Sequence, residues 1–354
     1  MTGVLPSQGL RALIEAGVIA AERPVEPAQV QPASLDLRLG AFAVRVRASF
    51  LAGRGRRVEE RLGDFEMHRF PLEGGAVLEK GCVYLIPLME RLSLPEGVEG
   101  AANAKSSTGR LDLLTRTTCD GAVEFDRVPP GYEGPLWAEV CPRSFSVLVR
   151  PGMRLNQLRL REGEARLEDR ALRALHAREA LADEAVIDDG LAFSVDLSGP
   201  RAGWRAKPHA GVIDLGRLGH YAPSEFWDEV RPEGARIILD PGAFYILMSR
   251  EAVTVPPDHA AEMAPYLAMV GEFRVHYAGF FDPGFGCGTP SRGVLEVRAH
   301  EAPFALEHGQ VVGRLVFERM AEVPDSLYGQ GIASNYQGQG LKLSKHFREP
   351  GSAG

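Results

Sequence analysis

The segment KSSTGR, from Lys105 to Arg110, gathers two cationic side chains and three hydroxyl groups within six positions. Hydroxyls, backbone amides and a guanidinium group together suit the oxygen atoms of a phosphate chain. The spacing differs from the GxxxxGK[ST] pattern of P-loop proteins. The segment therefore predicts an anion site of another kind, and a polar surface loop is the alternative interpretation.

A second candidate is AGFFDPG, residues 278–284, where an apolar strand runs into an Asp-Pro-Gly turn. In the functional interpretation, the backbone of this hairpin reads the edge of a base while Asp282 accepts a hydroxyl group of a sugar. The alternative is a plain hairpin in which Asp282 only caps the turn.

Two glutamates stand between apolar residues on predicted strands, Glu139 in WAEV and Glu296 in VLEV. A carboxylate in such a place is costly unless it is paired or used. Burial raises the pKa of a carboxyl group, which a general acid or base requires. An outward-facing glutamate on an amphipathic strand is the alternative at either position.

Short strands separated by Gly and Pro are the elements that must position these groups, from residue 31 to about 160 and again from about 190 to 320. This pattern is typical of sandwiches, jelly rolls and barrels. Residues 7–22 have the spacing of an amphipathic helix, and the Ala-, Leu-, Glu- and Arg-rich stretch 162–185 predicts a connecting helix. The polar, Gly-rich end from Asp325 predicts a mobile tail or a lid over a ligand.

The two β-rich halves repeat each other at nearly constant offsets. LEKGCVYLIPL from Leu78 matches LDPGAFYILMS from Leu239 at an offset of 161, and Glu139 falls on Glu296 at an offset of 157. SLDL at 34–37 likewise matches SVDL at 194–197. Constant offsets with small changes at the turns indicate a duplicated domain.

The composition narrows the function classes. The 354 residues include 40 Lys+Arg and 47 Asp+Glu, and the net charge of −7 disfavours a protein that coats nucleic acid. No run approaches the ~18 apolar residues of a membrane span, and the N-terminus does not read as a signal peptide. The four scattered cysteines suit a reducing compartment. We expect a cytoplasmic protein that binds neither nucleic acid nor membranes.

Together these segments resemble the trimeric dUTPase/dCTP deaminase superfamily. KSSTGRLDL is similar to its Ser-Ser motif, AGFFDPGFG to its base-and-sugar hairpin, and SLDLRLG to its first strand. YGQGIASNYQGQGLKLSK is similar to the C-terminal lid of dCTP deaminases. That lid, the helix at 7–22 and the strand at 31–40 favour the deaminase branch over plain dUTPase.

The resemblance implies a mainly β fold: two tandem dUTPase-like domains of the distorted jelly-roll or β-barrel type with a connecting helix. The expected limits are 1–165 for the domain with the Ser-Ser motif and 166–190 for the helical connector. The second domain, with the hairpin, then covers 191–324, and the lid covers 325–354.

The two copies have diverged in complementary ways. Copy one keeps the Ser-Ser motif, with Lys105 where the family usually has Arg, but it has Pro129 where the hairpin has Asp. Copy two keeps Asp282 but has no Ser-Ser at 264–267. In the family, sites lie between subunits, so the phosphate motif of one copy is expected to meet the hairpin of the other in one composite site per chain.

The implied activity is hydrolytic deamination of dCTP to dUTP and ammonia, with one carboxylate shuttling protons. Glu296 is the favoured base because it follows the intact hairpin, and Glu139 is the alternative. Ser106 and Arg110 would help to fix the water and the pyrophosphate region. The nucleotide-binding positions implied are Lys105, Ser106, Ser107, Thr108, Gly109, Arg110, Ala278, Asp282, Val294, Leu295, Tyr328, Asn335 and Gln339.

The nucleotide is expected to carry Mg²⁺ on its phosphates. Zinc is not expected, because the H-x-E and P-C-x-x-C motifs of zinc deaminases are absent. A dUTP diphosphatase in which Asp282 activates water, and a catalytically inactive nucleotide sensor, are the alternative functions. A homo-oligomer is expected, because the family builds threefold rings and each chain supplies two copies.

Overall fold

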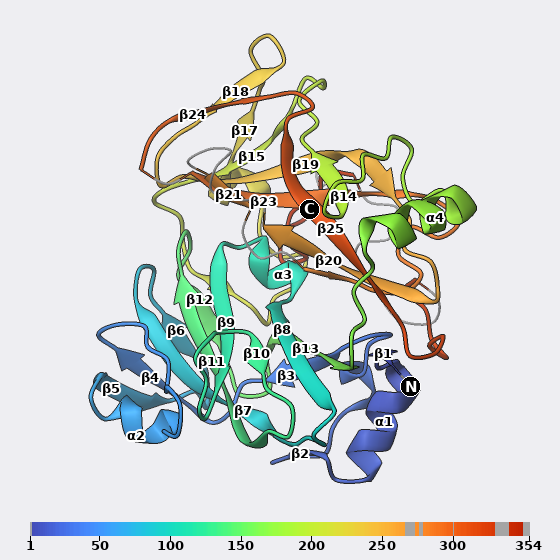
Figure 1. Cartoon of the computed structure of the whole chain (residues 1–354). Helices are drawn as coiled ribbons and strands as arrows, with labels where there is room; N and C mark the ends of the chain where they lie inside the picture. Colours follow the sequence, from blue (N-terminus) through green and yellow to red (C-terminus); the bar gives the residue numbers. More distant parts are fainter. Residues whose placement is uncertain (1, 266–272, 276–278, 300, 330–339, 350–354) are drawn as a thin grey trace. The chain divides into compact units, whose positions relative to one another are not determined.

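The computed structural model describes residues 2–265, 273–275, 279–299, 301–329 and 340–349 (Figure 1). Most regular structure in these residues is β-strand, in several small and mostly antiparallel sheets, which confirms the mainly β prediction. The chain divides into two units. The first comprises 1–165, 212–217 and 320–326, and the second comprises 166–211, 218–319 and 327–354.

The first unit contains two larger sheets, in the orders β1-β13-β8-β10 and β5-β4-β7-β11-β9, and a smaller sheet β16-β12-β6. β3 pairs with β13, and β2 pairs with β7. Its elements are β1 (Gly3–Val4), α1 (Ser7–Glu15), β2 (Ile19–Ala21), η1 (Pro27–Gln29), β3 (Leu35–Arg38), β4 (Phe42–Val46), α2 (Val58–Leu62), β5 (Glu66–Pro71), β6 (Ala76–Leu78), β7 (Val83–Ser93), β8 (Val98–Ala104), α3 (Ser106–Gly109), β9 (Leu113–Cys119), β10 (Arg127–Val128), β11 (Glu133–Pro142), β12 (Val147–Val149), β13 (Arg154–Glu162) and β16 (Ile213–Asp214).

The second unit has the sheets β14-β25-β20-β22 and β17-β15-β19-β23-β21 and the ribbon β18-β24. Its core is apolar and includes Phe193, Leu247, Leu295 and Phe317. Its elements are α4 (Asp169–Glu179), β14 (Leu191–Ser194), β15 (Gly203–Ala206), α5 (Pro223–Phe226), β17 (Trp227–Val230), β18 (Arg236–Leu239), β19 (Phe244–Val253), β20 (His259–Pro265), β21 (Phe273–Val275), β22 (Phe280–Phe281), β23 (Ser291–Ala299), β24 (Phe304–Glu307) and β25 (Val311–Arg319).

Both units use the same strand registers. β11 places Glu139 opposite Leu85 of β7, and β23 places Glu296 opposite Ile246 of β19. Each unit also has a buried tyrosine whose hydroxyl accepts a backbone N–H five residues earlier. The bonds run from Glu79 to Tyr84 (3.0 Å) and from Asp240 to Tyr245 (2.9 Å). The two pairs are related by the offset of 161 found in the sequence repeat, which confirms the tandem copies.

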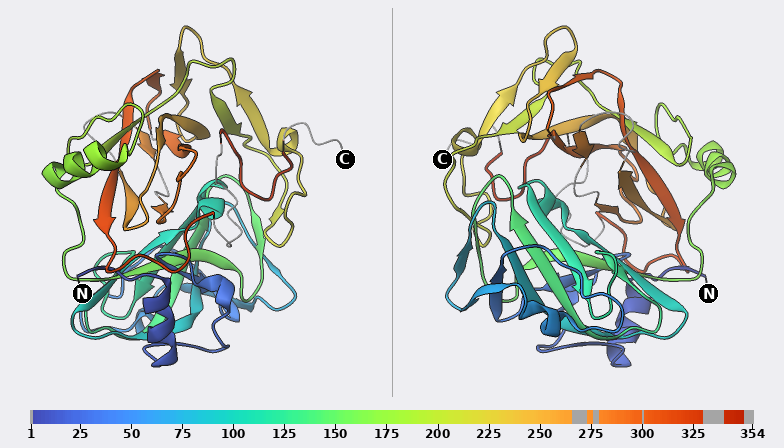
Figure 2. Two further views of the ribbon diagram at one scale, coloured as in Figure 1. Left: turned by 90° about the vertical axis from the view of Figure 1, so that its right-hand side faces the viewer. Right: turned by 60° about the vertical axis from the view of Figure 1, so that its left-hand side comes forward.

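The helix predicted over 7–22 ends earlier, and part of that segment is a strand. α1 ends at Glu15, and the chain turns at Gly17, whose φ of +72° is the left-handed conformation that glycine adopts most easily. Residues Ile19–Ala21 then pair with β7. In Figures 1 and 2, α1 lies at the outer edge of the first unit, beside its strands.

The connecting helix predicted over 162–185 is also shorter, because α4 covers only Asp169–Glu179. Ala180 takes a left-handed conformation (φ +47°), and His176 Nδ1 accepts the N–H of Leu181 (3.1 Å). At the other end, the backbone N–H groups of Asp189 and Gly190 donate to the carboxylate of Asp169 and lower its pKa.

Strand β3 differs from the half-buried strand that its alternating sequence predicts. Asp36 and Arg38 are buried, like the leucines between and around them. The alternation of polar and apolar residues predicts one exposed and one buried face, but both faces of β3 are buried. Arg38 forms an ion pair with Glu90, and Asp36 forms one with Lys105. These pairs offset the cost of removing the two charges from water.

Two short segments from later in the sequence complete the first unit. β16 pairs in parallel with β12, and Arg150 forms a bidentate ion pair with Asp214 (2.6 and 3.0 Å). Ala321 donates its N–H to the carbonyl of Val4 (2.8 Å), and the carboxylate of Asp325 accepts hydrogen bonds from α1.

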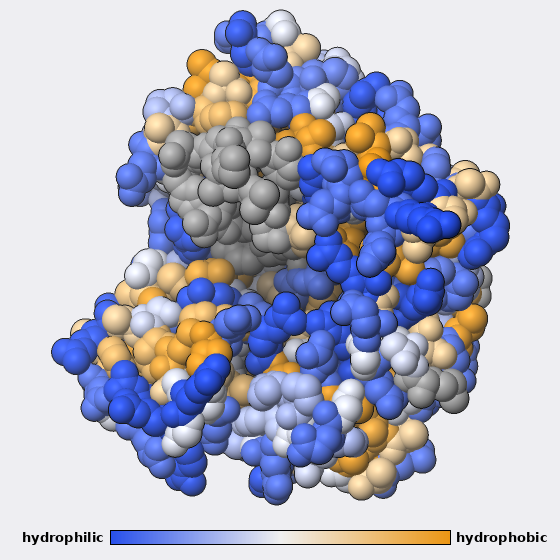
Figure 3. All heavy atoms as spheres, viewed as in Figure 1, coloured by the Kyte–Doolittle hydropathy of each residue, from blue (hydrophilic) through white to orange (hydrophobic). Residues whose placement is uncertain are grey.

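Exposed large apolar side chains are scattered over both units. On the face shown in Figure 3, hydrophobic residues form separate groups among hydrophilic ones. Single exposed apolar residues are normal on protein surfaces and mark no site by themselves. The most exposed include Met67, Val123, Val186, Leu218 and Ile238.

The Arg150–Asp214 pair generates a pH prediction. The hydrogen bonds from Arg150 lower the pKa of Asp214 from 3.8 to about 2. The stabilisation is therefore complete above pH 4–5 and is lost as pH falls towards 2. We expect Asp214→Asn to reduce the free energy of unfolding by about 1 kcal/mol at pH 7, because water screens the partly exposed pair.

Urea unfolding of the Asp214→Asn variant at pH 7 and at pH 3 tests this expectation. The difference from the wild-type protein should fall to about half at pH 3. Asp64→Asn, which removes the carboxylate of the exposed Arg61–Asp64 pair in the same unit, is the control and should change little. A difference for Asp214→Asn that grows as pH falls would contradict the assignment.

Candidate nucleotide site

The segment Lys105–Arg110 forms a tight turn at the end of β8. The N–H of Lys105 donates to the carbonyl of Leu155 (2.8 Å), and the carbonyl of Lys105 accepts the N–H groups of Thr108 (2.8 Å) and Gly109 (2.9 Å). Helix α3 begins directly after Lys105. The backbone therefore holds this segment at both ends.

The members of this turn differ in how far solvent reaches them. Lys105 and Ser106 are half-buried, whereas Ser107, Thr108 and Arg110 are buried. Asp112, which follows the turn, is buried and accepts the hydroxyl hydrogen of Ser144 (2.6 Å). Lys105 and Ser106 are therefore the side chains of the segment that an incoming anion reaches most directly.

Glu139 forms a cross-strand ion pair. It is directly opposite Arg116 of β9, whose Nη2 and Nε atoms donate to Oε1 of Glu139 (2.5 and 3.2 Å). The same guanidinium group stacks on the ring of Phe125 (3.7 Å) and donates to the hydroxyl of Ser49 (3.1 Å). The buried carboxylate is thus compensated by a partner on the neighbouring strand.

Glu296 occupies the equivalent position in the second unit and is 5% exposed. Its neighbours along β23, Leu295 and Val297, are completely buried. Val294 is half-buried. The described part of the neighbouring strand β21 ends at Val275, opposite Val297, and the next residue, His276, lies outside the described residues.

The hairpin after β22 carries Asp282, which is 8% exposed. The carbonyl of Asp282 accepts the N–H of Phe285 (3.0 Å), and the N–H of Gly284 donates to the carbonyl of Val255 (3.0 Å). These bonds close the Asp-Pro-Gly turn that the sequence predicts. They also fix the backbone from which the Asp282 side chain extends.

The end of the chain passes over this hairpin. The N–H of Tyr328 donates to the carbonyl of Pro283 (2.9 Å), and the ring of Tyr328 lies 5.6 Å from that of Phe285. Gly284 has a φ of +92°, and a Cβ atom there would lie 3.0 Å from Cβ of Leu327. The glycine therefore provides the conformation and the space for the tail to contact the hairpin.

The equivalent hairpin of the first unit is built differently. The pairing of β10 with β8 and of β22 with β20 places Pro129 at the position of Asp282. Gly131 takes the position of Gly284, and a Cβ atom there would lie 2.9 Å from Oε1 of Glu96. In this copy the atoms nearest to that position belong to a glutamate side chain.

The described end of the tail, 340–349, is packed rather than free. Phe347 contacts the rings of Phe226 (5.5 Å) and Trp227 (5.9 Å), and Leu343 and His346 are buried. A mobile tail is therefore the wrong description for this part. The spacing of Leu343 and Phe347 was the available sequence signal. Ala278, Asn335 and Gln339, and residues 266–267 of the copy-two phosphate region, lie outside the described residues.

Among the described residues, no group of three or more His, Cys, Asp or Glu side chains could hold a metal ion. No described helix is both long and apolar enough to cross a membrane. The four cysteines are free thiols, and burial raises the pKa of Cys119 to about 12, so this thiol is not a reactive group at neutral pH.

The fold and these motifs define a tandem-duplicated β protein with a Ser-Ser turn in one copy and an Asp-Pro-Gly hairpin in the other. Comparison with known families assigns it further. Residues 1–164 match the 2'-deoxycytidine 5'-triphosphate deaminase (DCD) N-terminal domain, and residues 168–347 match the C-terminal domain. The chain belongs to the 2'-deoxycytidine 5'-triphosphate deaminase family.

Individual relatives agree with this assignment. The crystal structure of 2'-deoxycytidine 5'-triphosphate deaminase from Agrobacterium tumefaciens is 52% identical, with a TM-score of 0.89, over 92% of this chain and 99% of that one. A "dCTP deaminase, dUMP-forming" from Salinispora arenicola is 33% identical over 44% of this chain and 77% of its own. A dCTP deaminase from Haloarcula marismortui is 29% identical over 45% of this chain and 80% of its own.

The Glu139–Arg116 pair generates a stability prediction. Arg116→Met leaves a buried carboxylate without its arginine, so we expect the free energy of unfolding to fall by about 2 kcal/mol. The effect is smaller than for a fully buried pair because the Arg116 side chain is 31% exposed.

Denaturant unfolding measures this loss, and the double variant Arg116→Met/Glu139→Met should recover part of it. Arg127→Met is the control, because Arg127 is 57% exposed and its carboxylate partner Glu124 is 3.9 Å away. An Arg116→Met protein as stable as the wild type would show that the pair contributes nothing.

Proposed function

We propose that the protein removes the 4-amino group of dCTP by hydrolysis and yields dUTP and ammonia. One observation carries this proposal: in this duplicated member of the deaminase family, each copy retains a motif that the other copy lacks. The first unit keeps the Ser-Ser turn, and the second keeps the hairpin with Asp282 and the buried Glu296. The reaction then needs groups from both units.

The reaction requires a group that moves protons. Water must lose a proton as its oxygen bonds to C4 of cytosine, and N3 must gain one. The C4–N4 bond then breaks as the new C4 hydroxyl loses its proton and becomes the carbonyl, and the amino nitrogen receives a proton and leaves as ammonia. One carboxylate can carry both protons in turn, first from water to N3 and then from the C4 hydroxyl to the amino nitrogen, and it ends unprotonated as it began.

We assign this role to Glu296. Its position on β23 follows the hairpin that keeps Asp282, and apolar residues flank it on the strand. At the matching position of the first unit, Glu139 already accepts two N–H groups of Arg116. The arginine thus occupies the carboxylate oxygen that a water molecule would otherwise contact. Glu139 is therefore the second choice.

The triphosphate is proposed to lie against the Lys105–Arg110 turn, where Lys105 and Ser106 are the more accessible side chains. Mg²⁺ then arrives with the substrate, bound to its phosphate oxygens. We propose that zinc takes no part, because the sequence lacks the H-x-E and P-C-x-x-C motifs with which zinc deaminases bind metal and activate water.

The name of the Salinispora arenicola relative favours a second candidate function, in which dUMP is formed from dCTP. Product analysis separates the two. Ammonia and dUTP support deamination alone, whereas ammonia together with dUMP and pyrophosphate supports the second candidate. Tight binding of dCTP without turnover would instead indicate a nucleotide sensor.

We also propose a homo-oligomer, on the argument that two copies per chain supply only two-thirds of a threefold arrangement. Light scattering at micromolar concentration that returns the mass of one chain would contradict it. A cytoplasmic location is proposed from the four free thiols, which suit a reducing compartment.

The assignment of the base generates a kinetic prediction. Glu296→Gln keeps the shape of the side chain but removes the proton acceptor, so we expect kcat for dCTP to fall at least about a hundredfold. Glu139→Gln is the matched control, because it makes the same change at the equivalent position of the first unit, and kcat should stay within about threefold. The reverse ranking of the two variants would assign the reaction to Glu139.

The requirement for both units generates a further prediction. Ser106→Ala in the first unit and Asp282→Asn in the second should each abolish turnover of dCTP, although the other motif is intact. Ser198→Ala, which removes an exposed hydroxyl bonded to Asp196 (2.6 Å), is the control and should leave turnover unchanged. A fully active Asp282→Asn enzyme would refute the role of the hairpin.

A further inference from the structure

We propose that Asp36 is a positioning residue for triphosphate recognition, because it holds the ammonium group of Lys105 in place at the Ser-Ser turn. The inference rests on the proposed function, in which Lys105 contacts a phosphate group. It adds a residue from the first strand of the unit, far from the turn in sequence, to the groups that prepare the site.

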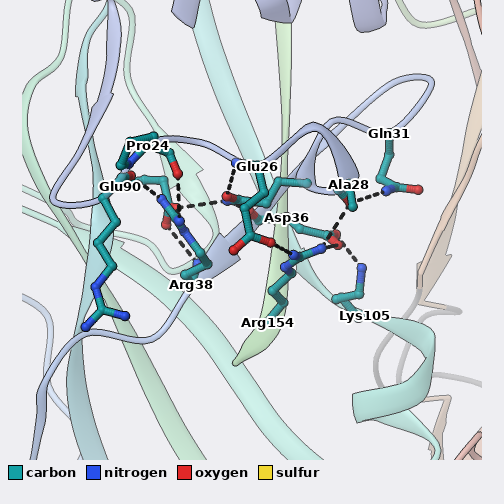
Figure 4. A network of polar contacts seen from close by, with 11 residues as sticks. Pro24, Glu26, Ala28, Gln31, Asp36, Arg38, Glu90, Lys105 and Arg154 are labelled. Carbon is teal, nitrogen blue, oxygen red and sulfur yellow. Dashed lines mark hydrogen bonds and ion pairs between the residues drawn. The ribbon is translucent and has the colours of Figure 1, made fainter. Parts of the chain in front are cut away.

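The carboxylate of Asp36 lies between two cations. One oxygen accepts a hydrogen bond from Nζ of Lys105, and the other lies 3.9 Å from Nη1 of Arg154. Figure 4 shows both side chains directed at Asp36. Asp36 itself is 2% exposed, so water competes little for these contacts.

A buried network fixes Asp36 in turn (Figure 4). Nε2 of Gln29 donates both to the carbonyl of Asp36 (2.8 Å) and to the carboxylate of Glu90 (2.9 Å). Glu90 is fully buried and also receives the backbone N–H and Nε of Arg38, each at 2.8 Å. The carboxylate that orients Lys105 is therefore attached to a part of the unit that cannot move independently.

Arg154 and Lys105 differ in whether their N–H donors can reach a ligand at the turn. Arg154 donates to the carbonyl of Ala28 (3.0 Å) and to the carboxylate of Glu26, so it is occupied on the side away from the turn. The side chain of Lys105 is 21% exposed, and an ammonium group has three donors, of which Asp36 accepts one. Lys105 can keep this bond and still donate to a phosphate oxygen.

The duplication provides an internal comparison. In the second unit, strand register places Ala192 at the position of Asp36, because Ala192 pairs with Arg314 of β25 as Asp36 pairs with Gln157 of β13. At the sequence offset of 161 between the copies, Lys105 corresponds to Tyr266, which lies outside the described residues. The aspartate and the lysine that bonds to it therefore occur together in the copy that keeps the Ser-Ser turn.

Two opposite effects of Asp36 on an anionic ligand must be weighed. Its negative charge opposes phosphate binding, but Arg154 offsets part of that charge. Its bond to Lys105 restricts a side chain with four rotatable bonds before the ligand arrives, which reduces the entropy lost on binding. We infer that the second effect is larger.

Asp36→Asn tests this, because it keeps the size of the side chain and removes the charge. We expect the KM for dCTP to rise about tenfold with kcat within about twofold. The inhibition constant of dCMP, measured by competition, should change less than twofold, because a monophosphate lacks the outer phosphates. In a Lys105→Met background, Asp36→Asn should have no further effect on KM. Asp196→Asn, which makes the same change at an ion-paired aspartate of the second unit, is the control and should leave KM unchanged.

A KM for dCTP that falls or stays the same in Asp36→Asn would overturn the inference, and so would equal losses for dCTP and dCMP or additive effects with Lys105→Met. If Asp36→Asn does not fold, Asp36→Glu carries the same test, because it keeps the charge but displaces the ammonium group. Unchanged KM in that variant overturns the inference as well.

The failure of the proposed function would look different. If the wild-type enzyme does not turn over dCTP, calorimetric binding of dCTP and dCMP gives the same comparison of Asp36→Asn with the wild type. If Lys105→Met binds dCTP as tightly as the wild type, the phosphate role of the turn fails, and the positioning role of Asp36 fails with it.

Discussion

The hydrogen bonds and ion pair of one buried glutamate, Glu90, are the interaction on which the first unit depends. Glu90 of β7 takes hydrogen bonds from Arg38 of β3 and from Gln29, and so joins three separate parts of the chain. Removing one partner of such a buried pair costs about 3–5 kcal/mol, because the other charge is left in the interior. In the second unit, Glu251 similarly accepts the N–H and hydroxyl of Ser194. A buried glutamate therefore accepts hydrogen bonds in both units, from the neutral Ser194 in the second and from Arg38 in the first.

Duplication explains how the two units can differ in chemistry while they share this framework. Strand registers are equal in both copies, so each copy offers the same positions for functional side chains. Once two copies are present, a motif that survives in one is no longer required in the other. The loss of the aspartate at Pro129, with Glu96 over Gly131, and the ion pair that occupies Glu139 are consistent with that division.

Much of the fold was predictable from the sequence because a duplication leaves its offsets in the printed residues, and Leu78–Leu88 and Leu239–Ser249 align without a gap. The Lys105–Arg110 turn and the Asp282 hairpin were found by residue type alone. Helix limits were predicted less well, because an amphipathic pattern continues past Gly17 into residues that a neighbouring strand captures. The burial of Asp36 was missed, because alternation assigns polar residues to solvent and the compensating Lys105 lies 69 residues away.

The inclusion of residues 320–326 in the first unit has a consequence for biosynthesis. Ala321 and Asp325 bond to Val4 and to α1, at the opposite end of the sequence. A ribosome delivers the chain from its N-terminus, so the first unit emerges with these partners not yet made. Its edge at β1 and α1 can be finished only after residues 166–319, most of the second copy, have been translated. The N-terminal unit is therefore the first to begin folding and among the last parts to be completed.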